Sequence, residues 1–258
     1  FITCIWSRAA SFQYGGLRNG FGYRDTVQDI QGIIHLNPEL AKKQLTFMIS
    51  AQVDNGGGLP LVKYTHNAGH EDTPDDESYV RETQHPSYRA DDALWLFPTV
   101  DKYMSESGNY DYLKEVIPFA NNGEGTVYEH LKRAIQFSME RLGANSMPAG
   151  LHADWNDCLN LNCFSENPGE SFQTFGPSEG PVAESVFIAG MFVAVGPDYI
   201  RMCEQKGLAD KAAEAKKAIE EMTEAVLDAG WDGEWFVRAY DAYSNKIGSK
   251  ECDEGKIF

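Results

Sequence analysis

Apolar residues recur along much of the chain at the three- and four-residue spacing of an amphipathic helix. The first such stretch covers residues 26–36. Asn37-Pro38 is a typical helix start and predicts a second helix to about Val53. The run Asn55–Gly58 then ends the pair. The pattern therefore predicts an αα-hairpin at the beginning of the chain.

The same periodicity predicts further helices, some of them paired, so the pattern indicates an all-α protein. The expected helices cover residues 91–105, 111–116, 126–142, 182–206 and 208–229, with Glu184 in the first turn of the fourth. The second helix of the last pair is expected to bury one face, which consists of Ala212, Ala215, Ile219, Met222, Val226 and Leu227. Between helices, residues 56–89 and 163–181 are expected as long polar loops, and residues 230–240 as a hairpin-like extended segment.

Composition narrows the class of protein. The chain has 258 residues and a net charge of −17, which argues against nucleic acid and anionic membrane surfaces as partners. A few placed Arg residues are still able to hold a phosphate. Five Cys residues, an odd number, predict reduced thiols in a cytoplasmic protein. The sequence contains no run of about 18 apolar residues, so no membrane span is expected.

The segment that carries the most chemistry lies near the middle of the chain. It places His152, Asp154, Trp155, Asn156 and Asp157 within six positions, between two turn-like flanks. An indole face covers the apolar face of a sugar ring, and nearby carboxylates and amides hold its hydroxyl groups. A carboxyl group beside an indole also loses water, which raises its pKa and suits it to donate a proton. The alternative is a capped loop whose carboxylates only bond backbone amides.

A family resemblance favours the sugar site. The run Ala153–Asn162 resembles the catalytic signature of the family 94 glycoside phosphorylases, of the cellobiose phosphorylase type. This resemblance implies that Asp157 is the general acid and that Trp155 lines the site of the donor sugar. The run Gly169–Thr174 resembles the same type.

A second motif lies near the beginning of the chain, in a segment rich in aromatic residues, glycine and arginine. Arg18–Asp29 is similar to the family's glycine–aromatic–Arg–Asp motif, which implies that Arg18 and Asp25 hold the donor sugar. Arg24 belongs to the same motif and is taken as a substrate contact, while Arg8 matches an arginine that the family uses on phosphate. The alternative is a surface loop with solvated arginines.

Two more acidic residues are candidate sugar contacts. Asp92 lies in an Asp-Asp-x-Leu-Trp-Leu element that the family has beside its site, and Glu184 lies in an element that borders it. Both acids also suit the first turn of a helix for electrostatic reasons alone. The segment His85–Arg89 departs from the cellobiose phosphorylase pattern, which leaves the acceptor sugar open. The acids and histidines of residues 56–89 match no metal-ligand spacing, so no metal site is expected and the loop is expected to be solvated.

Taken together, the resemblance implies an (α/α)6 toroid, of which residues 1–258 would form an incomplete part of a single catalytic domain, without the family's flanking domains. It implies inverting phosphorolysis of a β-linked glucose disaccharide, cellobiose or a similar sugar. The products would be α-glucose 1-phosphate and a free sugar. Inorganic phosphate would be the co-substrate, no cofactor is expected, and the full-length enzyme is expected to be a homodimer. An isolated fragment is expected to be inactive. Two alternatives stay open: an inverting hydrolase on the same toroid, and a non-catalytic carbohydrate-binding fragment.

Overall fold

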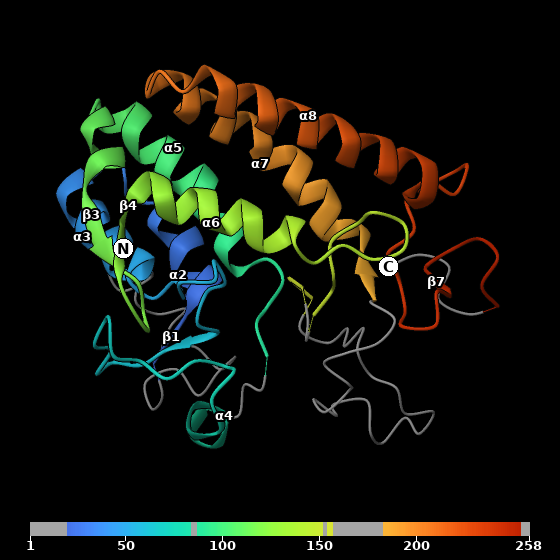
Figure 1. The fold of residues 1–258 in the computed structure, drawn as a ribbon, viewed down its shortest axis with the longest axis horizontal. Coiled ribbons are helices and arrows are strands. Elements are labelled where there is room, and N and C mark those ends of the chain that lie inside the picture. The colour runs from blue at the N-terminus through green and yellow to red at the C-terminus, as the bar shows by residue number, and fades with distance from the viewer. Residues whose placement is uncertain (1–19, 84–86, 152–153, 157–182, 254–258) are drawn as a thin grey trace. The chain divides into compact units, whose positions relative to one another are not determined.

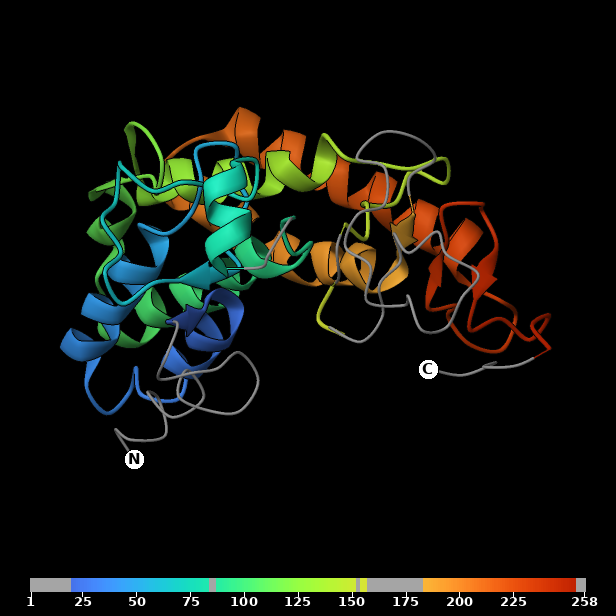
Figure 2. The ribbon, with the colours of Figure 1, turned by 90° about the horizontal axis from the view of Figure 1, so that it is seen from below.

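The chain forms two compact units, and each has its own helices and short strands (Figures 1 and 2). The computed structural model describes residues 20–83, 87–151, 154–156 and 183–253. The first unit consists of residues 1–88 and 92–135, and the second of residues 89–91 and 136–258.

The first unit begins with a short strand and two helices. Its elements in chain order are β1 (Phe21–Gly22), α2 (Tyr23–Ile30), α3 (Pro38–Ile49), β2 (Leu61–Val62), α4 (Glu77–Thr83), the 3-10 helix η2 (Asp92–Trp95), α5 (Leu96–Ser107), the 3-10 helix η3 (Tyr110–Lys114), β3 (Val116–Pro118), β4 (Glu124–Thr126) and α6 (Val127–Met139), whose last turn belongs to the second unit. Strand β1 pairs with β2 and β3 pairs with β4, both antiparallel.

The expected first αα-hairpin is present. Asn37 caps α3, because its side-chain oxygen accepts a hydrogen bond from the Leu40 amide at 3.0 Å. Helix α2 begins three residues earlier than the apolar pattern suggested and ends at Ile30, with turns from there to Asn37. Helices α2, α3 and α5 pack together, and Val27, Ile30 and Leu45 are fully buried between them.

The expectation that residues 56–89 form a solvated loop is wrong for much of this segment. It contains β2 and α4, and its backbone is bonded to the β3–β4 hairpin through Gly69 N to Phe119 O (2.7 Å) and Glu71 N to Ala120 O (2.9 Å). The strands of this unit have two or three residues each, too few to show an alternating pattern. Their pairing satisfies backbone N–H and C=O groups, and the sequence pattern does not reveal this pairing.

His130 is a packed core residue of the first unit. It is fully buried on α6, with Nδ1 2.7 Å from Gln52 Oε1 and Nε2 3.0 Å from Ile117 O. The ring lies against Phe119 at a centroid distance of 4.1 Å. Burial, aided by the charge of Arg133 and opposed by the contact with Ile117, lowers the pKa of His130 to about 4.

The second unit is built on a long helical hairpin. Its elements are β5 (Glu184–Ser185), α7 (Val186–Gln205), α8 (Ala209–Ala225), the π-helical turn η5 (Val226–Gly230), β6 (Ala239–Tyr240) and β7 (Lys246–Ile247). The expected pairing of the last two long helices is confirmed, since α7 and α8 run side by side (Figure 1). They approach closely at Gly196, where an added Cβ would lie 2.2 Å from Ile219 Cδ1. Strand β6 joins β5 and β7 in an antiparallel sheet.

Two expectations for this unit are corrected. Glu184 does not begin a helix, because β5 holds it in a strand between Ala149 and Tyr240, and α7 starts two residues later. Leu227, expected on the buried face of the last helix, is 58% exposed, because the π-turn η5 shifts the register at that point.

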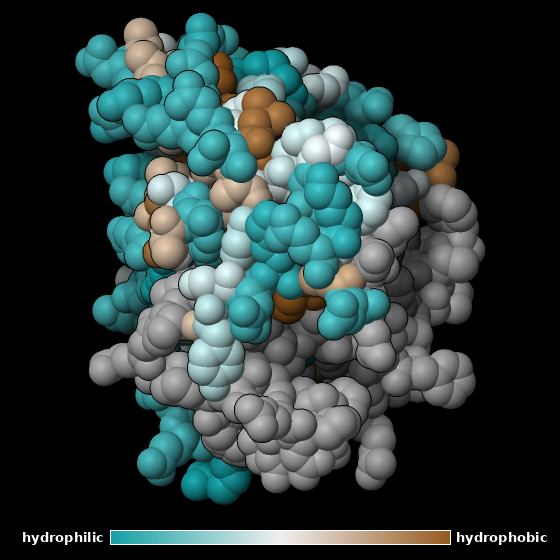
Figure 3. Space-filling model, turned by 90° about the vertical axis from the view of Figure 1, so that its right-hand side faces the viewer, coloured by the Kyte–Doolittle hydropathy of each residue, from teal (hydrophilic) through white to brown (hydrophobic). Residues whose placement is uncertain are grey.

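The hydropathy of helix α7 and the distribution of hydrophobic residues on the surface are relevant to membrane binding and to docking of partners. Within the described part of the chain, α7 alone is long and apolar enough to span a membrane, with a mean hydropathy of 1.4. Half of that stretch is buried inside the protein. On the face in Figure 3, hydrophobic residues outside the grey region form small groups separated by hydrophilic ones.

Candidate active site

The predicted donor-sugar motif lies at the start of α2. Gly20, with φ of +145°, approaches β2 so closely that an added Cβ would lie 2.1 Å from Val62 O. An added Cβ at Gly22 would likewise lie 2.4 Å from Asp25 Oδ2, so glycine lets this carboxylate fold back over the helix start. Arg24 is 5% exposed and Asp25 is half-buried. Arg8 and Arg18 lie outside the described residues, and their roles stay predictions.

Asp92 comes from a distant part of the sequence but joins the same region of the first unit. Helix α2 packs against η2, where Asp92 is 2% exposed. An added Cβ at Gly58 would lie 3.0 Å from the Tyr23 ring and 3.1 Å from Asp92 Cβ, so both residues lie close against Gly58. Burial, and next the charge of Asp92, raises the pKa of Tyr23 well above its ordinary value. The fold thus brings the predicted contacts Arg24, Asp25 and Asp92 onto two adjacent elements.

The aromatic residue of the central motif is available to a ligand. Trp155 is 54% exposed, whereas the preceding Asp154 is fully buried. Asp157 and His152 lie outside the described residues. An exposed indole beside a buried carboxylate suits the stacking role predicted for Trp155.

Asp154 has a structural role that sequence reasoning did not assign. Its Oδ1 accepts hydrogen bonds from Asn156 N at 2.9 Å and from Arg238 Nη2 at 2.5 Å. Its Oδ2 accepts one from Ser185 Oγ at 2.7 Å. The carboxylate therefore ties the backbone beside Trp155 to two distant segments of the second unit.

Arg238 and Ser185 are the residues that the sequence analysis missed. Arg238 lies 84 positions after Asp154, and its guanidinium also stands 5.5 Å from the centroid of the Phe187 ring. Ser185 Oγ caps α7 by accepting a hydrogen bond from Ile188 N at 3.1 Å. No local sequence pattern links either residue to Asp154; the only signal is a Ser at a helix start.

Glu184 points to the other side of β5 from Ser185, as the alternation of a strand requires. Its Oε1 accepts from Asn145 N (2.9 Å) and Met147 N (3.1 Å), and its Oε2 from Asn145 Nδ2 (2.6 Å). The carboxylate is 1% exposed and fills the turn Gly143–Met147. These contacts give Glu184 a structural role, and its predicted contact with substrate stays a prediction.

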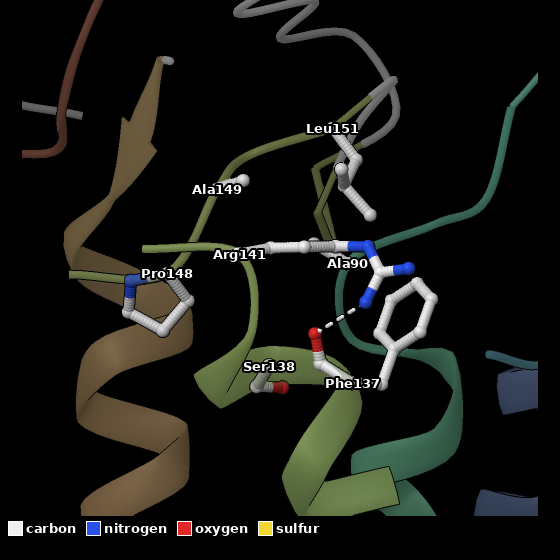
Figure 4. A pocket seen from close by; sticks show the side chains of 7 residues that line it. All are labelled: Ala90, Phe137, Ser138, Arg141, Pro148, Ala149 and Leu151. Atoms are coloured by element: carbon white, nitrogen blue, oxygen red, sulfur yellow. Dashed lines mark hydrogen bonds between the residues drawn. The ribbon is translucent and has the colours of Figure 1, made fainter. Parts of the chain in front are cut away.

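The segment that leads from this turn to Trp155 is held on both edges. Ala149 forms a bridge with Glu184, and Leu151, with φ of +50°, forms one with Arg89. A hollow of about 10 Å³ lies beside this segment, lined by Ala90, Phe137, Ser138, Arg141, Pro148, Ala149 and Leu151. The Arg141 side chain crosses it between Leu151 and Phe137 and donates to Phe137 O at 2.9 Å (Figure 4). The hollow has room for about one water molecule, so it is no sugar site.

A larger groove, of about 740 Å³, lies between the end of α6, residues 142–146 and α8. None of the predicted site residues lines it. Among the described residues, no three His, Cys, Asp or Glu side chains gather as ligands for a metal ion.

Comparisons with known proteins match the whole chain. Residues 1–258 match the glycosyl hydrolase 94 superfamily, catalytic domain. The chain is 34% identical over 270 residues to the N,N'-diacetylchitobiose phosphorylase of Vibrio furnissii, which covers 99% of this chain and 31% of that protein. It is 30% identical to the solabiose phosphorylase of Paenibacillus borealis, over 100% of this chain and 29% of that protein. It is also 30% identical to the cyclic beta-(1,2)-glucan synthase NdvB of Rhizobium meliloti, over 98% of this chain and 8% of that protein. The chain thus spans less than a third of the length of these relatives.

Proposed function

Because the chain belongs to the glycosyl hydrolase 94 superfamily, we propose that it is part of a glycoside phosphorylase that acts on a β-linked glucose disaccharide such as cellobiose. Membership also confirms the family expected from the sequence and its fold class, the all-α (α/α)6 toroid. The observation that carries the proposal is the catalytic-domain match over residues 1–258, together with two relatives named as disaccharide phosphorylases.

In the proposed reaction, Asp157 donates its proton to the glycosidic oxygen as the bond from that oxygen to the anomeric carbon breaks. An oxygen of inorganic phosphate forms a bond to the same carbon from the opposite face, so its configuration inverts. The products are α-glucose 1-phosphate and a free sugar. A hydrolase would need a second carboxylate to activate water, whereas phosphate is already an anionic nucleophile and only has to be positioned, a role proposed for Arg8.

The residues proposed to bind the donor sugar supply complementary chemistry. Trp155 offers an exposed aromatic face, which suits stacking on a sugar ring. Asp25, half-buried in the first turn of α2, offers carboxylate oxygens for hydroxyl groups, and the proposal assigns the same role to Arg18 and Arg24. Asp92, on the element that packs against α2, is proposed as a further contact. No metal ion or organic cofactor takes part in this proposal.

The decisive assay uses the natural full-length protein. It is incubated with cellobiose, N,N'-diacetylchitobiose or solabiose, with and without inorganic phosphate, and the sugar 1-phosphate is measured. Product that requires both cellobiose and phosphate supports the proposal. Phosphorolysis of only another disaccharide would retain the phosphorylase and refute the cellobiose-like specificity. Release of free sugar at the same rate without phosphate would indicate a hydrolase, and synthesis of a cyclic β-(1,2)-glucan would indicate a synthase like the third relative.

A pair of Asp-to-Asn variants tests the acid. We expect Asp157→Asn to lower phosphorolysis by roughly 10²–10⁴-fold, because the leaving oxygen then receives no proton from the enzyme. Asp210→Asn is the matched control, since Asp210 is exposed at the start of α8, and we expect it to retain normal activity. Near-normal phosphorolysis by Asp157→Asn would refute the assignment.

A cytoplasmic location and a homodimer in the full-length protein are part of the same proposal. The odd number of Cys residues supports a reducing compartment, and among the described residues Cys203 and Cys252 are not joined in a disulfide. Cell fractionation and sedimentation of the full-length protein test the two points.

A further inference from the structure

We propose that Arg238, with Ser185, is a positioning residue for the loop that carries Trp155 and continues into Asp157. The effect on catalysis rests on the proposed function. The contacts from which we infer the positioning role do not depend on that function. We use the term carboxylate clamp for Asp154, Ser185 and Arg238.

The clamp gathers three segments at one buried side chain. Asp154, with no exposed surface, lies immediately before Trp155. Arg238 Nη2 donates to its Oδ1 and Ser185 Oγ donates to its Oδ2, so both oxygens are held by groups far away in the sequence. The Asn156 amide donates to Oδ1 at 2.9 Å, which fixes the backbone on the other side of Trp155.

The partners of Asp154 are themselves fixed. Arg238 directly precedes β6, and its amide donates to Ile247 O at 2.8 Å within the β6–β7 hairpin. Ser185 lies in β5, opposite Ala239, and also caps α7. The position of the loop beside Trp155 is therefore fixed by a sheet and by the end of a helix, and not by the loop's own conformational preferences.

The chemistry suits Arg238 better than a lysine at the same position. A planar guanidinium presents a fork of donors; Nη2 reaches Asp154 while Nη1 stands 3.5 Å from Ser185 Oγ. A lysine would keep the positive charge but not this fork. The side chain of Arg238 is 13% exposed, so the pair is largely shielded from water and from salt.

A catalytic group has to be held closely, since a displacement of about 1 Å is able to cost roughly 100-fold in rate. Asp157 follows Asn156 directly in the sequence, so a change in the backbone at Asn156 is transmitted to it through a single peptide link. The clamp would thus set kcat without touching the substrate.

The test compares Arg238→Lys with Arg201→Lys in the full-length protein. Arg201 pairs with Asp198 on the surface of α7, half of its side chain is exposed, and it serves as the matched control. For Arg238→Lys we expect kcat for phosphorolysis to fall about 10- to 100-fold while KM for phosphate stays within about twofold. Amide hydrogen exchange should accelerate in a peptide spanning residues 151–160 and stay unchanged in α8. The control should match the wild type in all three measurements.

The outcomes separate this inference from the proposed function. Faster exchange at residues 151–160 with unchanged kcat would show that the clamp is only structural, and unchanged exchange would show that Arg238 does not hold the loop; either result overturns the proposal. If the wild type catalyses no phosphorolysis, the proposed function fails, and the exchange measurement still decides whether the clamp holds the loop. If Arg238→Lys does not fold, Asp154→Asn removes the charge of the pair with little change in shape and is measured in the same way.

Discussion

Substitution of Gly143 by alanine should strongly destabilise the second unit, because the space for a methyl group is filled by Glu184. An added Cβ at Gly143 would lie 2.3 Å from Glu184 Cγ and 2.4 Å from Cδ. Ordinary contacts of this kind are about 3.4–4 Å, so one side must move by more than about 1 Å. The backbone of Gly143 is not in the left-handed region, so the effect is steric and not a matter of φ.

Neither side is free to move. The backbone of Glu184 is paired with Ala149 and Tyr240, and its carboxylate accepts three hydrogen bonds from the turn that contains Gly143. Overpacking of a rigid site costs about 1–3 kcal/mol. A hydrogen bond to a charged group is worth about 1.5–3 kcal/mol, so losing one adds to that cost. We expect Gly143→Ala to lower the free energy of unfolding by about 2.5–6 kcal/mol, the sum of these two costs.

The measurement is urea or thermal unfolding of the full-length protein, monitored with a probe that reports on the second unit. Gly190→Ala is the matched control: Gly190 is exposed on α7, and an added Cβ meets nothing within 4 Å. Because glycine in a helix is less favourable than alanine by about 0.5–1 kcal/mol, this control should raise the stability. If Gly143→Ala were as stable as the wild type, the placement of Glu184 in the turn would be refuted.

Two further predictions concern pH and sugar binding. With a folded pKa of about 4 against an ordinary value of 6.5, His130 binds fewer protons in the folded state, so its contribution is complete above about pH 6.5 and is lost as the pH falls toward 4. The wild type should therefore lose roughly 3 kcal/mol more than His130→Gln between pH 7 and pH 4, and an NMR titration showing a charged ring at pH 6 would contradict this. Trp155→Ala should raise KM for the disaccharide about 10-fold with little change in stability, because the indole is 54% exposed, whereas Trp231→Ala, at 44% exposed, should leave KM unchanged. An unchanged KM in Trp155→Ala would exclude stacking on the sugar.

The sequence alone was enough to predict the helical hairpins and the family. Helix periodicity and local start signals are properties of neighbouring residues, so α3, with its Asn37 cap, and the α7–α8 pair could be predicted directly. The catalytic motifs are also local, which is why a short run around Trp155 carries the resemblance. The gathering of Asp25 and Asp92 on adjacent elements could only be guessed from that resemblance.

The tertiary structure decided what holds two of the acids. Glu184 and Asp154 look equivalent to sugar-binding acids in the sequence, yet their carboxylates bond the Gly143–Met147 turn and Arg238 respectively. Strands of two residues are too short to leave a periodic pattern, so the alternation that sends Glu184 and Ser185 to opposite sides of β5 is invisible before folding. The sequence by itself therefore determined the longer helices, the family and the candidate chemistry, because these depend on near neighbours. Only the tertiary structure decided the distant partners of the Asp154 and Glu184 carboxylates, because these lie 31 to 84 residues away in the sequence.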